Sequence, residues 1–337
     1  MHAETTECEE TMIDSDEGLL PPNPDTAYGK RRRLGVELEF SGMDIDTASS
    51  IVEAQFGGSV EVVSDFEHRV QDTSLGEFNV ELDFEYLKAA GRDESLDRDS
   101  LLDHLPQWVV AEMARLVVPI EVVSPPVAMQ KLPRLDAVVE RLRDAGALGT
   151  RQSPVYAFGM HLNPEMPALD ADTITRYLRA FLCLYEWLLR ESDVDWSRRL
   201  TPYINPFPTE YVRLVVSPDY APTLTGLMDD YLATNADRNR ALDMLPLFAH
   251  IDEKRVRAAI DDPRIKPRPT LHYRLAHCDI DLGDWGIVTA WRHWLEVERL
   301  ANDPVRLTSI ATAYHDHLGA ISSRAFGDWA AQCEQWL

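Results

Sequence analysis

The sequence has few cysteines, few basic residues and no long uncharged apolar run. Its four cysteines, Cys8, Cys183, Cys278 and Cys333, are scattered and form no CxxC spacing. This pattern excludes a zinc knuckle, a CxxC redox motif and a disulfide framework, so we expect reduced thiols. Lys and Arg total 33 against 57 Asp and Glu, which gives a formal net charge of −24. Because binding to nucleic acid requires basic patches that displace counterions from phosphate, the composition argues against a nucleic-acid partner.

No segment has the length and apolarity of a membrane span. The longest apolar stretch, residues 108–123, is interrupted by Glu112, Arg115 and Glu121, whereas a span needs roughly 20 uncharged residues. The N-terminus has neither the basic start nor the apolar core of a signal peptide. With a hydrophobic content of 45%, these features predict a soluble cytoplasmic protein with a large core and no membrane partner.

The chain divides into an acidic tail and a folded body. Residues 1–28 contain eight Asp and Glu, three Pro and no Lys or Arg, a composition that predicts disorder. We expect residues 29–337 to form a single domain, with a helical insertion near 84–116 and a helical C-terminal part at 278–337.

Two periodicities alternate along the body. A period of two predicts strands at residues 33–41, 59–66, 69–74, 77–84, 117–124, 155–163, 210–216 and 270–277. A period of 3.6 predicts helices at residues 101–116, 132–145, 170–190, 222–232, 253–260, 287–301 and 307–321, with a last helix that includes Trp329 and Trp336. The hairpin-like succession of strands, followed by helices, predicts an α+β protein with a largely antiparallel sheet.

Several predicted strands carry metal-binding side chains on their polar faces. Glu37 and Glu39 project from one face of the first strand, about 6.6 Å apart along it. The full set comprises Glu37, Glu39, Glu121, His161, Asn163, His272 and Arg274. Taken singly, each residue also fits a strand face in contact with water. Together, clustered carboxylates and imidazoles without Lys favour a divalent cation such as Mg²⁺ or Mn²⁺.

A second acidic set alternates with apolar residues between positions 77 and 85. It consists of Glu77, Glu81, Asp83 and Glu85. No His or Arg joins it, so a solvent-exposed strand face is the favoured interpretation.

Five short motifs follow one another along residues 31–276. They are RRRLGVELEF (31–40), VQDTSL (70–75), IEVVSPPV (120–127), AFGMHLNPE (157–165) and RPTLHYRL (268–275). In this order they resemble motifs of the amidoligase family, a branch of the carboxylate-amine ligase superfamily that includes glutamine synthetase and glutamate-cysteine ligase. The chain departs from the family pattern in two ways: residues 76–116 form a longer insertion, and His272 stands where the last motif usually has Glu.

The resemblance implies a fold and a set of functional residues. The fold is a sheet curved into a funnel, with helices packed on its outer face, ATP at one end and the acceptor carboxylate at the other. The implied metal ligands are Glu37, Glu39, Glu121, His161 and His272. Arg274 would clamp the transferring phosphoryl group. Asp72 and Ser74 would lie near the metal or the acceptor, Asn163 would line the same pocket, and Asp72 is the first choice for a catalytic base. Lys266 and Arg268 are weaker phosphate candidates, for which a basic surface loop is the favoured alternative.

The resulting functional hypothesis is an ATP- and Mg²⁺-dependent (or Mn²⁺-dependent) ligase that forms an amide bond through an acyl phosphate. The family implies a peptide or cell-wall component as acceptor and an amino acid or ammonia as amine, the ammonia being supplied by a separate glutamine amidotransferase. Two alternatives stay open at this point. One is a metal-dependent amide hydrolase that uses the same ligands to activate water. The other is a catalytically degenerate peptide-binding or scaffold protein that acts through its acidic tail.

Overall fold

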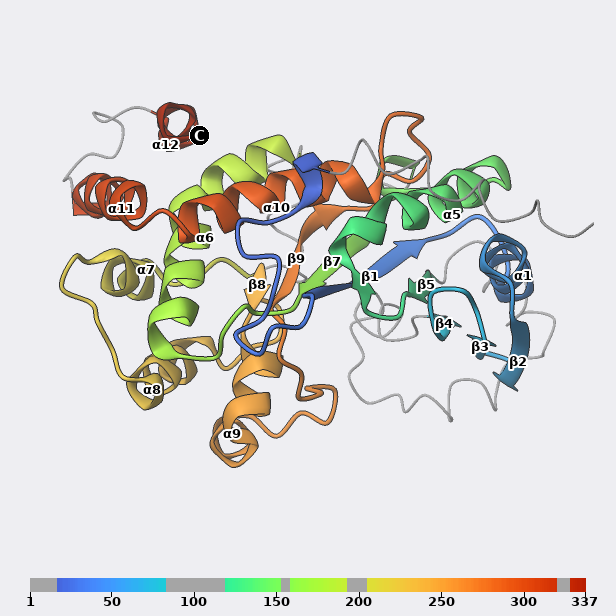
Figure 1. The fold of residues 1–337 in the computed structure, drawn as a ribbon, viewed down its shortest axis with the longest axis horizontal. Coiled ribbons are helices and arrows are strands. Elements are labelled where there is room, and N and C mark those ends of the chain that lie inside the picture. The colour runs from blue at the N-terminus through green and yellow to red at the C-terminus, as the bar shows by residue number, and fades with distance from the viewer. Residues whose placement is uncertain (1–16, 83–118, 153–157, 193–204, 320–327) are drawn as a thin grey trace, which may run out of the picture.

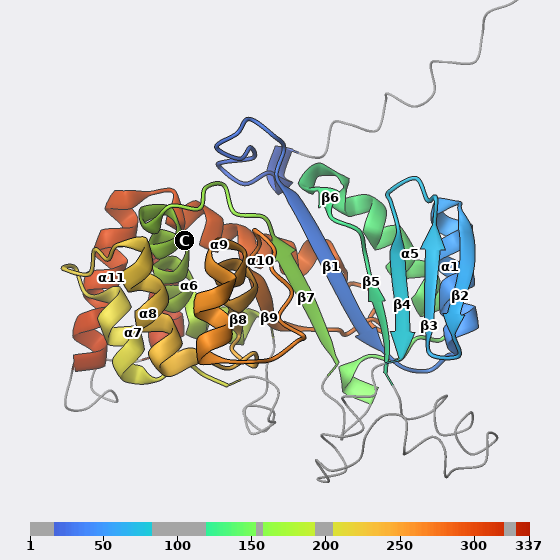
Figure 2. The ribbon, with the colours of Figure 1, turned by 90° about the horizontal axis from the view of Figure 1, so that it is seen from below.

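A single antiparallel sheet is the centre of the computed structural model, which describes residues 17–82, 119–152, 158–192, 205–319 and 328–337. The strand order is β2-β3-β4-β5-β1-β7-β9-β8, and the short β6 pairs with β1 (Figure 2). The strands are β1 (Arg33–Phe40), β2 (Ser59–Ser64), β3 (Glu67–Gln71), β4 (Phe78–Leu82), β5 (Ile120–Val123), β6 (Val127–Ala128), β7 (Gly159–Pro164), β8 (Leu242–Asp243) and β9 (His272–His277). Each pair of neighbours is antiparallel, as the sequence predicts.

Helices cover one face of this sheet, which we call the apolar face. The described α-helices are α1 (Ile45–Phe56), α5 (Leu132–Asp144), α6 (Ala171–Glu191), α7 (Thr209–Val216), α8 (Leu224–Asn235), α9 (Leu245–Ala259), α10 (Ile287–Ala301), α11 (Pro304–Gly319) and α12 (Trp329–Cys333). In Figure 2, α1 and α5 lie behind strands β1 to β5. At β9, Tyr273 packs edge-on against Phe181 of α6 and tilted against Trp294 of α10. Helix α9, which follows β8, lies on the opposite side of the sheet from α5 and α10 (Figure 1). The rest of that opposite face is left for polar side chains, and we call it the polar face.

The alternation of β1 explains how these two faces arise. Leu34, Val36, Leu38 and Phe40 are all buried, whereas the residues between them are half-buried. Burial of four large apolar side chains stabilises the sheet on its helix side. The period-two reading of this strand is confirmed, and it leaves Glu37 and Glu39 on the polar face.

Part of the predicted acidic tail is ordered. Residues 1–16 lie outside the described residues, but Glu17–Leu19 form a short 3₁₀ helix, labelled η1. Leu19 is buried, and its carbonyl accepts a hydrogen bond from Trp291 Nε1 of α10 at 2.8 Å. A buried apolar side chain and a satisfied indole offset the cost of ordering this segment. The ordered body therefore begins well before residue 29.

Arg32 ties the same segment to the helices. Its Nη2 lies 2.7 Å and its Nη1 2.9 Å from the two carboxylate oxygens of Glu298 on α10, and both side chains are fully buried. Tyr177 and Trp294 also donate to Glu298. A bidentate Arg–carboxylate pair of this kind fixes the relative orientation of the two side chains and pairs their charges. It anchors the start of β1, the strand that carries Glu37 and Glu39.

One predicted element is wrong, and three elements of the structure were not predicted. Residues 210–216, predicted as a strand, form helix α7, in which Tyr211, Val212, Val215 and Val216 are buried on one helical face. The β-branched valines favoured a strand on propensity, and the burial of this face overrode it. Helix α1 was not predicted; Asp44 caps it by accepting from the Thr47 amide at 2.8 Å. The two-residue strands β6 and β8 were also missed.

The α+β class is confirmed, and most helix predictions agree with the structure. The helix expected at 287–301 has these bounds in α10, and Asp170 is the N-cap of α6. The helix expected at 101–116, and with it the insertion near 84–116, lies outside the described residues. The curvature of the sheet into a funnel stays a prediction. None of the helices that the structure describes combines the length and apolarity needed to cross a bilayer.

Candidate metal centre

Strand register gathers the predicted ligands in the middle of the polar face. Glu37 of β1 lies opposite His161 of β7, and Glu39 lies opposite Glu121 of β5. Directly opposed residues of an antiparallel pair have Cβ atoms about 5 Å apart, so their side chains contact one another. His272 reaches the same place from β9, which pairs with the other edge of β7.

Two groups of side chains have donor atoms close enough to hold a metal ion. Glu37, His161 and His272 form one group, and Glu39, Glu121 and His161 form the other; within each, the ligand atoms lie within 4.8 Å of one another. His161 belongs to both groups. All five ligands implied by the resemblance are thus brought together. Carboxylate oxygens and imidazole nitrogens suit Mn²⁺ and Mg²⁺, with imidazole favouring the softer ion, so the residues present fit the expected cation.

Glu37 contacts three polar side chains of the centre. Its Oε2 lies 2.9 Å from His161 Nδ1, and its Oε1 accepts from Asn163 Nδ2 at 2.9 Å. Arg268 Nη2 is 3.7 Å from the same Oε1. Burial alone would raise the pKa of Glu37, but His272, His161 and Arg268 together hold the pKa of this carboxyl well below its usual range. Glu37 is therefore ionised at neutral pH.

His272 links the centre to two arginines. Its Nδ1 lies 2.7 Å from Asn163 Oδ1, and its Nε2 lies 3.2 Å from Arg274 Nη1. Arg268 Nη2 donates to the same Asn163 oxygen at 2.8 Å. Burial, with the nearby charges of Arg274 and Arg268, holds the pKa of His272 well below its usual range despite the attraction of Glu37. The ring is therefore neutral at pH 7, and the hydrogen bond from His161 and the charge of Arg268 are what stabilise the Glu37 carboxylate.

Asp243 is a buried acid beside these arginines that sequence reasoning missed. It lies opposite His272 across the β8–β9 pair, and its Oδ1 accepts from the Leu245 amide at 2.9 Å. Burial raises the pKa of Asp243 to about 7, although the Leu245 amide, Arg274 and Arg238 lower it. A two-residue strand gives almost no periodic signal, so its position next to β9 was not readable from the sequence.

Gly159 lets two of the donor side chains approach the backbone of β7. Its amide donates to Glu39 Oε2 at 2.7 Å. A Cβ at this position would lie 2.7 Å from His161 Nε2 and 3.3 Å from Glu39 Oε2. The space that a side chain would fill is thus occupied by the imidazole and the carboxylate, which is a physical reason for glycine in this strand.

An irregularity in the β7–β9 pair adds His277 to the polar face. Met160 pairs with Ala276 and Leu162 with Tyr273, so the register shifts between these two pairs. Beyond the shift, His277 lies opposite Gly159. A bulge of this kind redirects the side chains that follow it. Simple alternation along the strand placed His272 and Arg274 on the polar face and did not place His277 there. His277 is buried, and Gly159, which lies opposite it, donates its amide hydrogen to Glu39.

The opposed carboxylates Glu39 and Glu121 are part of an acidic row that continues further across the sheet than predicted. Glu81 of β4 lies opposite Glu121, and Glu67 of β3 lies opposite Glu81. The sequence assigned Glu81 to a solvent-exposed face because no His or Arg joins its acidic set. The pairing of β4 with β5, which brings Glu81 beside Glu121, could not be read from the sequence. Of its companions, Asp83 and Glu85 lie outside the described residues.

Three other predicted residues are not gathered at the centre. Asp72 and Ser74 are exposed on the loop after β3, which is three strands from β1, or roughly 14 Å at the usual strand spacing. Asp72 adopts a left-handed backbone with φ 57°, which Asp tolerates better than most residues. Ser74 Oγ accepts from Arg134 Nη2 at 3.0 Å. Lys266 is exposed in the loop before β9, whereas its neighbour Arg268 reaches the centre.

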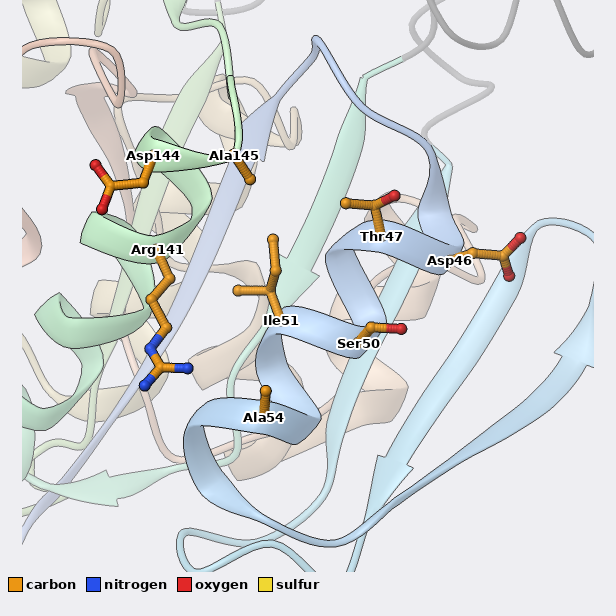
Figure 3. A pocket seen from close by; sticks show the side chains of 8 residues that line it. All are labelled: Asp46, Thr47, Ser50, Ile51, Ala54, Arg141, Asp144 and Ala145. Carbon is orange, nitrogen blue, oxygen red and sulfur yellow. The ribbon is translucent and has the colours of Figure 1, made fainter.

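Two other features of the fold, a shallow hollow and a buried Ser–His–Asp set, resemble functional sites. A shallow hollow lies between α1 and α5, on the helix side of the sheet, lined by Asp46, Ile51 and Arg141 among others (Figure 3). Next to it, Ser49 Oγ lies 2.9 Å from His68 Nδ1, and Asp46 lies 3.8 Å from the other ring nitrogen. Ser49 is fully buried and donates to the Ile45 carbonyl. This Ser–His–Asp arrangement therefore presents no accessible nucleophile.

Comparison with known proteins gives one match. The model of a family described as "putative amidoligase enzyme" matches residues 30–296. Searches of curated proteins and of solved structures find no match. The matched range covers the strands and arginines described above, from β1 to β9.

Proposed function

Because the chain belongs to the amidoligase family, we propose that it is an ATP-dependent carboxylate-amine ligase that forms an amide bond through an acyl phosphate. One observation carries this proposal: the Glu–His centre and two arginines, Arg268 and Arg274, lie side by side on the polar face. Phosphoryl transfer needs cations around the phosphate oxygens, and little covalent chemistry from the protein.

The residues of the centre have distinct proposed roles. Mg²⁺ or Mn²⁺ would be held by donors from these two groups, which share His161, and would neutralise charge on the phosphate oxygens. Arg274 clamps the terminal phosphoryl group, and Arg268 and Asn163 line the same pocket. Lys266 and Ser74, both exposed, are the weaker candidates for nucleotide contacts.

The proposed reaction has two steps. An oxygen of the acceptor carboxylate attacks the terminal phosphorus of ATP, and ADP leaves. The amine nitrogen then attacks the carbonyl carbon, phosphate leaves, and a base takes the surplus amine proton. Asp72, the candidate for that base from the sequence, lies three strands from β1, roughly 14 Å at the usual strand spacing. That distance is beyond the hydrogen-bond reach at which a base takes a proton from an amine at the centre.

The substrates and partners of this reaction are proposals that follow from the family. We expect a peptide or cell-wall carboxylate as acceptor, an amino acid or ammonia as amine, and a separate glutamine amidotransferase where ammonia is used. We also expect the sheet to curve into a funnel around the substrates and the protein to act in the cytoplasm.

Nucleotide-dependent stabilisation tests the proposal. Mg-ATP at 100 times its dissociation constant should stabilise the folded protein by about 2.7 kcal/mol, seen as a rise in the thermal midpoint. The double variant Glu37→Gln plus Glu39→Gln should lose this rise. The matched variant Glu67→Gln, which removes a carboxylate from β3, should keep it. If the unchanged protein gains no stability with or without a carboxylate acceptor, or the double variant gains as much, the ligase proposal is wrong.

The same centre also supports a second candidate, a metal-dependent amide hydrolase. The observation that favours it is the His-containing group Glu39, Glu121 and His161, a donor set that can activate water when a metal is bound. The product distinguishes the two functions. A ligase releases ADP in step with amide formation, whereas a hydrolase cleaves an amide without nucleotide.

A further inference from the structure

The two candidate metal groups share one imidazole, and its hydrogen bonds decide between them. We propose that Glu39, Glu121 and His161 Nε2 are the metal ligands of this protein, and that Glu37 and His272 are positioning residues. This inference rests on the metal-binding part of the proposed function. It differs from the ligand set implied by the family resemblance, in which all five residues bind metal.

His161 offers a single lone pair for a metal. A neutral imidazole has one N–H and one unprotonated nitrogen. Nδ1 lies 2.9 Å from Glu37 Oε2, and the other oxygen of this carboxylate accepts from Asn163 Nδ2 and faces Arg268, so the carboxylate is the acceptor and Nδ1 carries the hydrogen. The lone pair is then on Nε2, which lies 3.7 Å from Glu39 Oε1. His161 therefore serves the group with Glu39 and Glu121 rather than the group with Glu37.

Glu37 is already surrounded by donors. One oxygen accepts from His161, and the other accepts from Asn163 Nδ2 with Arg268 Nη2 only 3.7 Å away. A divalent cation at Glu37 would be repelled by the Arg268 charge. A carboxylate that orients the histidine ligand of a metal is a common arrangement, and its loss typically lowers metal affinity about 10- to 100-fold.

His272 has both ring nitrogens engaged. The amide group of Asn163 donates to Glu37, so its oxygen is the atom that faces His272 Nδ1 at 2.7 Å. Nδ1 also lies 3.0 Å from Arg268 Nη2, which can only donate. A hydrogen on Nδ1 satisfies two contacts, the one to Asn163 and the one from Arg274 Nη1 to Nε2 at 3.2 Å, whereas a hydrogen on Nε2 would satisfy only the Arg268 contact. With its lone pair occupied by Arg274, His272 holds the arginine and not a metal.

These contacts form one continuous chain of hydrogen bonds. It runs from Arg274 through His272, Asn163 and Glu37 to His161. The chain joins the proposed phosphate clamp to the metal-binding imidazole. His in place of the family's Glu at position 272 fits this role, because an imidazole can donate at one nitrogen and accept at the other, whereas an ionised carboxylate only accepts.

Calorimetric titration with Mn²⁺ alone, without nucleotide, tests the assignment. Glu39→Gln and Glu121→Gln should each weaken Mn²⁺ binding by more than about 100-fold, and Glu37→Gln by about tenfold. His272→Gln should leave Mn²⁺ affinity unchanged and weaken binding of ATP, measured separately. Glu67→Gln is the matched control and should bind Mn²⁺ like the unchanged protein.

A metal-free measurement reports the positioning role of Glu37 directly. In ¹⁵N-histidine spectra, His161 should be protonated at Nδ1 in the unchanged protein and shift toward the Nε2-protonated form in Glu37→Gln. Loss of Mn²⁺ binding in Glu37→Gln or His272→Gln as complete as in Glu39→Gln would overturn this inference and leave the ligase proposal standing. If the unchanged protein binds no Mn²⁺, both fail. Should Glu37→Gln not fold, the comparison of His272→Gln with Glu121→Gln decides the question.

Discussion

The close approach of Gly159 to His161 makes one methyl group a sensitive probe of the centre. In Gly159→Ala the new Cβ would lie 2.7 Å from His161 Nε2, and an ordinary contact begins at 3.4 Å, so the ring must move by about 0.7 Å. Metal–ligand distances tolerate deviations of only about 0.2 Å. His161 is nearly buried and held by Glu37, so it cannot yield freely. We expect Mn²⁺ affinity to fall at least about tenfold, or about 1.4 kcal/mol.

The variant should remain folded, because overpacking of this size typically costs about 1–3 kcal/mol. Chemical denaturation measures that cost, and calorimetry with Mn²⁺ measures the affinity. Gly283→Ala is the matched control, since a Cβ there has no atom within 4 Å and should leave both quantities unchanged. Mn²⁺ binding to Gly159→Ala as tight as to the unchanged protein would refute the placement of His161 over this glycine.

Three further predictions concern stability. Replacing Arg32 with Met leaves Glu298 buried and unpaired by any cation, and should lower the free energy of unfolding by about 3–5 kcal/mol; urea denaturation measures it, and a loss below about 1 kcal/mol would contradict the buried ion pair. Asp243 has a pKa of about 7 in the folded state against 3.8. Asp243 therefore loses its proton at a lower pH in the unfolded chain than in the folded protein. The free energy of unfolding falls by up to about 4 kcal/mol as pH rises from about 4 to 7. Asp243→Asn should remove this loss, so its stability relative to the unchanged protein should climb over that window and then level off; a pH-independent difference would show that the burial argument is wrong. Asp170→Ala removes the cap that accepts from Thr173 at the start of α6, and thermal denaturation should show a cost of about 1 kcal/mol; an unchanged midpoint would contradict the cap.

Much of the centre could be predicted because strand periodicity is a local property. Alternation within β1 is enough to put Glu37 and Glu39 on one face, and the same holds for His161 and Asn163 in β7. The order of the five motifs then indicated that these strands belong to one site. The structure agrees with both steps.

What could not be predicted depends on contacts between distant parts of the chain. Glu81 joins the acidic row only because β4 pairs with β5, and His277 joins the polar face only because β9 shifts register against β7. Asp243 lies in a strand too short to have a period. In α7, Val212 and Val215 have strand propensity, yet their burial on one helical face overrides it.

The central place of β1 also has a consequence for how the protein folds. The contacts of the centre join residues far apart in the chain: Glu37 and His161 are separated by 124 positions, Glu39 and Gly159 by 120, and Asn163 and His272 by 109. Proteins dominated by such non-local contacts fold slowly, because the chain loses the entropy of loop closure before these contacts form and stabilise the fold. β1 is the first strand in the chain, but it can pair with β7 only after the long intervening segment has folded back. During refolding, Mn²⁺ binding should appear only with the slowest step that completes the sheet.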